Sequence, residues 1–188
     1  MAGNTENGGG RRGNRWRIAI WGSAALLLLL PLVAMQFTNE VNWDETDFIV
    51  FGAMLLAACG TYELAARKTG NSAYRAAVGV AVAAALLLVW MNLAVGIIGN
   101  EGNPANLMFG GVLAVGIIGA IITRFQPQGM ARALITTALA QALVGVIALA
   151  MGSVEAVVLT VFFAALWLTS AWLFRKAARE QVPAGAAS

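Results

Sequence analysis

The chain of 188 residues is 60% hydrophobic and only 11% charged, whereas soluble domains are about 45–50% apolar, so lipid is its expected solvent. Its formal net charge of +3 comes from basic residues spread over four separate segments, and no nucleic-acid partner is therefore expected. It contains no histidine and a single cysteine, which excludes histidine-ligated haem or metal, a histidine proton relay and an internal disulfide.

In chain order, a tail rich in Gly and Asn comes first, over residues 1–15, and is predicted to be disordered in the cytoplasm. Six apolar runs follow, each close to the roughly 20 residues that a helix needs to cross a bilayer. Their unbroken apolar character favours helices over barrel strands, which alternate apolar and polar residues. The predicted spans are 16–37, 47–66, 75–99, 105–124, 130–151 and 155–174. We therefore predict an all-α membrane protein with a six-helix transmembrane domain, 16–176, and a cytoplasmic tail, 177–188.

The first of these runs follows a basic lead, as the core of a signal peptide does. Its apolar core, 18–37, is longer than the roughly 7–15 residues of such a peptide and lacks a small-x-small cleavage site. We expect it to remain as an uncleaved helix that is kinked at Pro31.

All twelve basic residues fall on one side of the six-span arrangement. They are Arg11, Arg12, Arg15, Arg17, Arg67, Lys68, Arg75, Arg124, Arg132, Arg175, Lys176 and Arg179. The opposite side carries acidic residues, which are Glu40, Asp44, Glu45, Asp47, Glu101 and Glu155. Because cytoplasmic loops carry the excess of Lys and Arg, both termini are predicted to lie in the cytoplasm.

Three arginines precede the outward-going helices at regular intervals. Arg17, Arg75 and Arg132 are separated by 58 and 57 residues. This spacing favours three tandem helical hairpins related by an axis along the membrane normal. Apolar sequence of low complexity also aligns by chance, so coincidence is the alternative explanation.

Small residues concentrate in the third and fourth spans. They include Ala77, Ala81, Ala85, Gly96, Gly99, Gly110, Gly111, Gly116 and Gly119. Helices in lipid have no hydrophobic reason to meet, and small residues let their backbones approach closely. This pair of spans is therefore predicted to form the centre of the bundle.

Three polar residues lie within the predicted spans and could form an intramembrane site: Glu63, Asn92 and Gln141. Polar groups in lipid are costly and are often functional. Structural roles are the alternative. Glu63 could form an interfacial ion pair with Arg67, four residues later, and the two amides could hydrogen-bond between helices.

The loop between the third and fourth spans is the most distinctive polar stretch. Asn100, Glu101, Asn103 and Asn106 could form a surface for a partner or ligand. The alternative is a helix start, because Asn is a good N-cap and Pro104 suits the first helical position.

Catalytic motifs are missing from the sequence, which has no nucleophile elbow, no glycine-rich phosphate loop and no paired intramembrane carboxylates. No catalytic residue, cofactor or metal site is predicted, and the chain is not expected to be an enzyme. The small-residue faces favour a protein that acts by helix packing, as a homo-oligomer or an accessory subunit of a larger membrane complex. The alternative is a small permease or channel for a neutral or weakly polar solute.

Three stretches of the chain, 31–44, 61–68 and 92–104, resemble those of small six-helix bacterial inner-membrane proteins. The likeness would extend over nearly the whole chain. It implies location in a bacterial inner membrane, and it brings with it no activity, substrate or functional residue.

Overall fold

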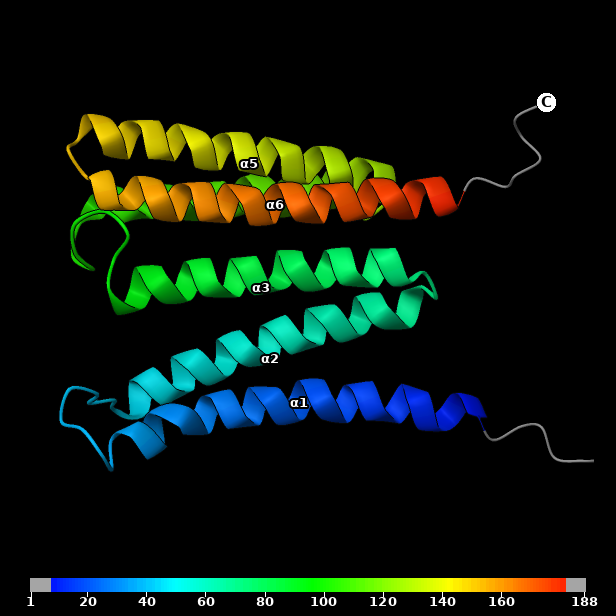
Figure 1. Ribbon diagram of the computed structural model, residues 1–188, viewed down its shortest axis with the longest axis horizontal. Helices are drawn as coiled ribbons and strands as arrows, with labels where there is room; N and C mark the ends of the chain where they lie inside the picture. Colours follow the sequence, from blue (N-terminus) through cyan, green and yellow to red (C-terminus); the bar gives the residue numbers. More distant parts are fainter. Residues whose placement is uncertain (1–7, 182–188) are drawn as a thin grey trace, which may run out of the picture. The chain divides into compact units, whose positions relative to one another are not determined.

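The computed structural model describes residues 8–181, with side chains from Trp16 onward. Over that stretch the chain forms six α-helices and one turn of 3-10 helix, without a strand, and the predicted all-α class is confirmed. The elements are α1 (Gly8–Ala34), α2 (Glu45–Lys68), α3 (Ser72–Ala94), η1 (Pro104–Asn106), α4 (Leu107–Ile122), α5 (Pro127–Ala150) and α6 (Val154–Glu180) (Figure 1). All six α-helical segments are long and apolar enough to cross a membrane, as expected of a multi-pass membrane protein.

The helix ends differ from the predicted spans at several places. α1 begins at Gly8, within the stretch predicted to be a tail, and α6 continues to Glu180, past the predicted end at 174. α3 ends at Ala94 and not at 99, because Gly96 has a φ of 69° and cannot continue a right-handed helix. The remaining residues of the two predicted tails, 1–7 and 182–188, lie outside the described part of the chain.

The chain divides into two compact units, Met1–Leu64 and Ala65–Ser188, called unit 1 and unit 2 below. Unit 1 contains α1 and most of α2. Within it, Leu28 of α1 lies over Gly52 of α2, at the 3.8 Å expected of van der Waals contact with an added Cβ. At the start of α2, the backbone N–H of Asp44 donates to Asp47 and that of Asp47 donates to Asp44, both at 3.0 Å. This reciprocal cap satisfies donors that a helix start otherwise leaves free.

In unit 2, α5 and α6 pack along a continuous seam, the α5–α6 seam. Its buried residues on α5 are Ala131, Leu134, Ala138, Gln141, Gly145 and Ala148. The buried residues of α6, which also contacts α3, are Ala156, Thr160, Phe163, Trp167, Ser170, Ala171, Phe174 and Ala177. Along α5 the spacing of these residues alternates between three and four, which is the pattern of coiled-coil packing. A Cβ added to Gly145 would lie 2.5 Å from Cγ2 of Thr160, so the absence of a side chain lets the two helices approach there.

The neighbouring face of α5 packs against α4, again through glycine. A Cβ added to Gly119 of α4 would lie 2.7 Å from the Cβ of Ala133, and one added to Gly116 would lie 3.1 Å from Oγ1 of Thr137. Residue numbers rise along α5 as they fall along α4, so these two helices are antiparallel. Gly116 and Gly119 of the fourth span therefore pack against α5, and not against α3 as the sequence suggested.

On its other side, α6 contacts α3. The hydroxyl of Ser170 donates to the backbone carbonyl of Ala77 at 2.7 Å, and the rings of Tyr74 and Phe174 meet edge to face at 5.0 Å. α6 thus lies between α5 and α3 (Figure 1). Among these helices of unit 2 the most buried is α5, and not the predicted third and fourth spans: 44% of the apolar window of α5 is buried, compared with 22% for α3 and 17% for the α4 segment.

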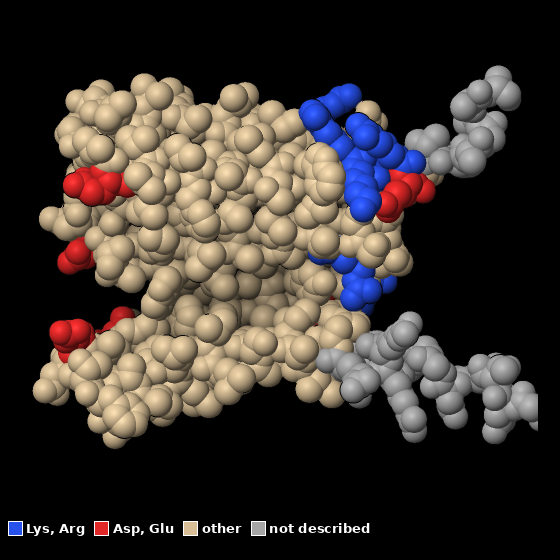
Figure 2. Space-filling model, in the orientation of Figure 1, with Lys and Arg blue, Asp and Glu red and all other residues tan. Residues whose placement is uncertain are grey.

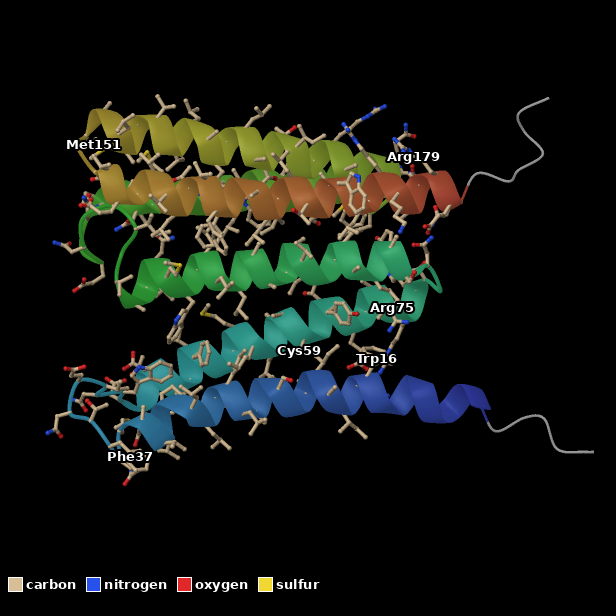
Figure 3. All side chains as sticks on the ribbon, viewed as in Figure 1. Trp16, Phe37, Cys59, Arg75, Met151 and Arg179 are labelled. Atoms are coloured by element: carbon tan, nitrogen blue, oxygen red, sulfur yellow. The ribbon has the colours of Figure 1, made fainter. Side chains whose placement is uncertain are left out.

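Charged side chains mark the two ends of unit 2. Because the packed pairs are antiparallel, the starts of α3 and α5 and the ends of α4 and α6 share one end. Its basic residues are Arg67, Lys68, Arg75, Arg124, Arg132, Arg175, Lys176 and Arg179. Figure 3 shows Arg75 and Arg179 at this end and Met151 at the other, and Figure 2 shows the segregation of charge. Glu180 also lies at the basic end, where it accepts a hydrogen bond from the side chain of Asn71 at 2.9 Å.

Candidate functional site

Glu63, the carboxylate predicted to lie within a span, is held between the two helices of unit 1. Nη2 of Arg17 lies 2.7 Å from its Oε1, and Nε1 of Trp21 donates to its Oε2 at 2.8 Å. Arg17 and Trp21 are four residues apart on α1, so they project from one face of that helix. Glu63 is only 8% exposed. The carboxylate is therefore compensated by a charge and a hydrogen bond, in a contact called the Glu63 clasp below.

The structure pairs Glu63 with Arg17, which lies 46 residues earlier in the chain and was not among the partners that the sequence suggested. A signal for this pairing was present in the sequence. Arg17 lies at the start of the first span and Glu63 near the end of the second, so a helical hairpin brings both to the same membrane depth. Helix-local spacing rules consider only neighbours three or four residues away, and so they miss this pair.

Asn92 folds back onto its own helix. Its Nδ2 donates to the backbone carbonyl of Leu88 at 2.8 Å, one turn earlier in α3. Its Oδ1 is buried without a hydrogen-bond partner. The side chain of Asn92 thus does not form the hydrogen bond between helices that the sequence offered as one of two interpretations.

Gln141 lies in the α5–α6 seam and is fully buried, with 0% of its surface exposed. Neither its amide nitrogen nor its amide oxygen has a hydrogen-bond partner. Two further seam side chains, Thr160 and Trp167, also have an unpartnered polar atom. The contact between Gly145 and Thr160 puts Gln141 level with α6 residues between 160 and 167. Sequence reasoning found Gln141 and missed the other two, whose mainly apolar surroundings gave no signal.

Asn92 and Gln141 lie at different depths in unit 2. The bond from Ser170 to Ala77 sets the register of α3 against α6, and it places Asn92 level with Glu155. Gln141 is level with the middle of α6, near residue 164, so about nine residues, or about 13 Å at the rise of an α-helix, separate the two amides. The structure therefore does not bring these two predicted residues together, and Glu63 belongs to unit 1, where Arg17 and Trp21 contact it.

The loop between α3 and α4 is built around Asn106, which is only 9% exposed. Its Oδ1 accepts from the backbone N–H groups of Ile97 and Ile98 at 3.1 and 2.8 Å. Its Nδ2 donates to the carbonyls of Ile98 and Asn100 at 3.3 and 2.7 Å. One side chain thus replaces the backbone pairing that this irregular segment lacks.

The other asparagines of the loop also bond locally. Asn103 accepts from the backbone N–H of Ala105 at 3.0 Å, as the cap of η1, and Asn100 accepts from Gly102 at 3.1 Å. The predicted helix start at this position is confirmed. The asparagine side chains of the loop therefore mainly stabilise its conformation. Glu101, beside them, is exposed on the surface.

Metal ligands are not grouped in the part of the chain that the structure describes, where no cluster of three or more Cys, Asp or Glu residues could hold an ion. The single cysteine, Cys59 of α2, is buried as a free thiol (Figure 3).

Comparison with protein-family models, with curated proteins and with solved structures finds no match to the chain.

Proposed function

We propose that the chain is a non-enzymatic protein of a bacterial inner membrane that acts by packing its helices against another membrane protein, either a second copy of itself or a subunit of a larger complex. The observation that carries this proposal is the presence of span glycines that no neighbouring side chain fills. A Cβ added to Gly22, Gly60, Gly110 or Gly111 would meet nothing of its own unit within 4 Å. These four positions are called the open glycines below.

The open glycines contrast with those that the fold uses. At Gly119 and Gly145 an added Cβ would approach a neighbouring helix to 2.7 and 2.5 Å. A glycine inside a helix costs about 0.5–1 kcal/mol relative to alanine, and close packing offsets that cost at Gly119 and Gly145. At the open glycines nothing described in the chain offsets it. Lipid does not require small residues, whereas a second helix does.

The exposed face of α5 shows what a lipid-facing surface looks like in this chain. It consists largely of big aliphatic side chains, such as Leu139, Leu143 and Val146, each more than half exposed. The open glycines interrupt such surfaces on α1, α2 and α4. This difference supports a role in association between helices rather than simple contact with lipid.

The proposed orientation places both termini in the cytoplasm. The gathering of basic residues at one end of unit 2, with Glu101 and Glu155 at the other, supports it through the positive-inside rule. Reporter fusions at each loop test this orientation. A fusion after Arg67 or Arg124 that is active in the periplasm would overturn it.

The permease alternative is less well supported. Its path requires polar side chains that converge, and Asn92 and Gln141 lie about 13 Å apart along unit 2. Gln141 is also enclosed by tightly packed helices.

The three tandem hairpins remain a proposal. The packing of the helices gives this repeat little support, because α3 and α4 make few contacts whereas α5 and α6 pack along their whole length.

The association proposal is tested by extracting the full chain from native membranes in mild detergent or polymer discs and measuring its assembly size and co-purifying proteins. Gly60→Leu and Gly110→Leu are expected to reduce the associated fraction severalfold, since each fills an open glycine position. Ala142→Leu is the matched control, because Ala142 is exposed on the lipid-like face of α5.

Thermal unfolding of each variant separates lost association from lost folding. The proposal fails if the wild-type chain is a monomer without a co-purifying protein. It also fails if the two glycine variants assemble as well as Ala142→Leu does.

A further inference from the structure

A small cavity of about 270 Å³ lies at the turn between α4 and α5, at the basic end of unit 2. Two arginines, Arg124 and Arg132, line it together with the polar residues Thr123, Gln126 and Gln128. Sites for drug-sized ligands measure roughly 300–1,000 Å³. The cavity therefore suits a smaller polar group.

The two arginines bring positive charge to this cavity, and the two helices that form it supply no counter-charge. No Asp or Glu occurs between Glu101 and Glu155, so neither α4 nor α5 carries a carboxylate. Among the described residues, neither Arg124 nor Arg132 takes part in an ion pair. Two like charges at one small cavity favour the binding of an anion that compensates both.

Backbone donors at the same cavity favour an anion as well. α5 begins with Pro127, which has no N–H, and its cap residue Gln126 makes no side-chain capping bond. The first amide to find a backbone acceptor is that of Met130, which donates to Gln126 at 2.8 Å. Within the described chain, the amides of Gln128 and Gly129 thus remain available beside the two guanidinium groups. Free amides and the positive end of a helix dipole attract negative charge.

The backbone around the open cavity is held in place by contacts among α3, α4 and α5. Arg124 and Phe125 both adopt left-handed backbone angles, with φ of 50° and 60°. The hydroxyl of Tyr74 in α3 donates to the carbonyl of Phe125 at 2.8 Å and ties this turn to α3. Gly129 lies so close to Thr123 that an added Cβ would come within 2.4 Å of it. A site with fixed walls loses less entropy when it binds.

We infer that this cavity binds a phosphate group, and that the headgroup of an anionic phospholipid in the cytoplasmic leaflet supplies it. Arginine forks match phosphate oxygens in pairs, and basic pockets between transmembrane helices on the cytoplasmic side hold anionic headgroups. The end of α4 and the start of α5 lie where the apolar spans meet water, which is the depth of lipid phosphates. The inference depends on the proposed orientation, and it does not depend on association through the open glycines.

The test uses the full chain purified in detergent and native mass spectrometry with added phosphatidylglycerol or phosphatidylcholine. The wild type is expected to retain phosphatidylglycerol in preference to phosphatidylcholine. The variant Arg124→Gln with Arg132→Gln is expected to lose at least about tenfold in that affinity, since two charge-assisted contacts disappear. The control, Arg175→Gln with Arg179→Gln, removes the same charge from the same end but leaves the cavity intact, and less than about a twofold change is expected.

Each outcome decides between the sources of phosphate. If inorganic phosphate at millimolar concentration displaces the lipid, and its own binding is lost in Arg124→Gln with Arg132→Gln, the phosphate site stands and its ligand is free phosphate. Equal retention of the two lipids by the wild type would overturn the inference. So would equal losses in the cavity variant and the control, because bulk charge would then explain the binding. If the wild type prefers phosphatidylglycerol but Arg124 proves periplasmic in the reporter fusions, the phosphate site stands, and both the proposed orientation and the assignment to the cytoplasmic leaflet are overturned.

Discussion

The two units of this chain hold their helices together in different ways. Unit 1 uses polar contacts, in which Glu63 receives Arg17 and Trp21 from the facing helix. Unit 2 uses shape, because Gly119 and Gly145 let neighbouring helices come so close that no Cβ would fit. In water, the burial of apolar surface would stabilise helix pairing in addition to these two kinds of contact. In lipid that contribution is missing between helices, so each kind of contact must by itself favour helix pairing over helix–lipid contact.

The largest expected effect comes from breaking the close packing of unit 2. Gly119→Val would push branched methyl groups into Ala133, and a loss of about 3 kcal/mol in the free energy of unfolding is expected, the upper end for overpacked cores. Gly110→Val on the same helix meets open space, and a change of less than about 1 kcal/mol is expected. Thermal unfolding in one detergent measures both. Equal losses would mean that helix propensity, and not packing, sets the stability of α4.

A smaller effect is expected from the Glu63 clasp of unit 1. Glu63→Leu removes the acceptor for two donors and should cost about 2 kcal/mol. Glu63→Gln keeps an acceptor for Trp21 and should cost about half as much, because the Arg17 side chain is 45% exposed and its ion pair is partly screened by water. Exposed Glu40→Gln is the control.

A double-mutant cycle with Arg17→Gln isolates the ion pair from the Trp21 bond. Its expected coupling energy is about 0.5–1 kcal/mol. A coupling near zero would show that the ion pair between Arg17 and Glu63 adds no stability, and the description of unit 1 as held by a charged contact would then have to be abandoned.

The smallest expected effect is a gain in stability. Gln141 interrupts the tight packing of unit 2 with an amide that has no partner, and Gln141→Met keeps its length while removing the two polar atoms. An increase of about 1 kcal/mol in the free energy of unfolding is expected, since an unsatisfied buried amide is costly. The matched change Gln128→Met, at an exposed position, should alter stability by less than about 0.5 kcal/mol. A loss on Gln141→Met would instead mean that the amide is hydrogen-bonded in the folded protein.

Hydropathy was enough to find all six helices, because the need to satisfy every backbone group in lipid leaves few other structures for a long apolar run. It was less informative about helix ends. The sequence placed 95–99 in the third span, whereas Gly96 and the side chain of Asn106 turn this segment into a loop. Single residues with unusual backbone angles decide such ends, and an average over a window hides them.

The packing partners were the least predictable feature. Counting glycines pointed to the third and fourth spans, but a glycine matters only where a neighbouring helix fills its space, and that depends on the facing sequence. The alternating spacing of small residues along α5 was visible in advance and was the better signal. In the candidate site, the sequence identified Glu63 and Gln141 as unusual polar residues. It did not identify their neighbours. Those of Glu63 lie more than 40 residues away in the chain, and those of Gln141 belong to a facing helix that carries no recognisable motif.

The connection between α5 and α6 is only three residues long, 151–153. During synthesis, the last helix therefore emerges directly behind its partner, and the chain entropy that opposes their meeting is small. The side chain of Gln141 is therefore exposed to hydrocarbon only briefly, because α6, the helix that covers it, enters the bilayer next. We therefore expect α5 and α6 to insert as a helical pair, in which the unpartnered amide of Gln141 is shielded from lipid as soon as both helices are in the bilayer.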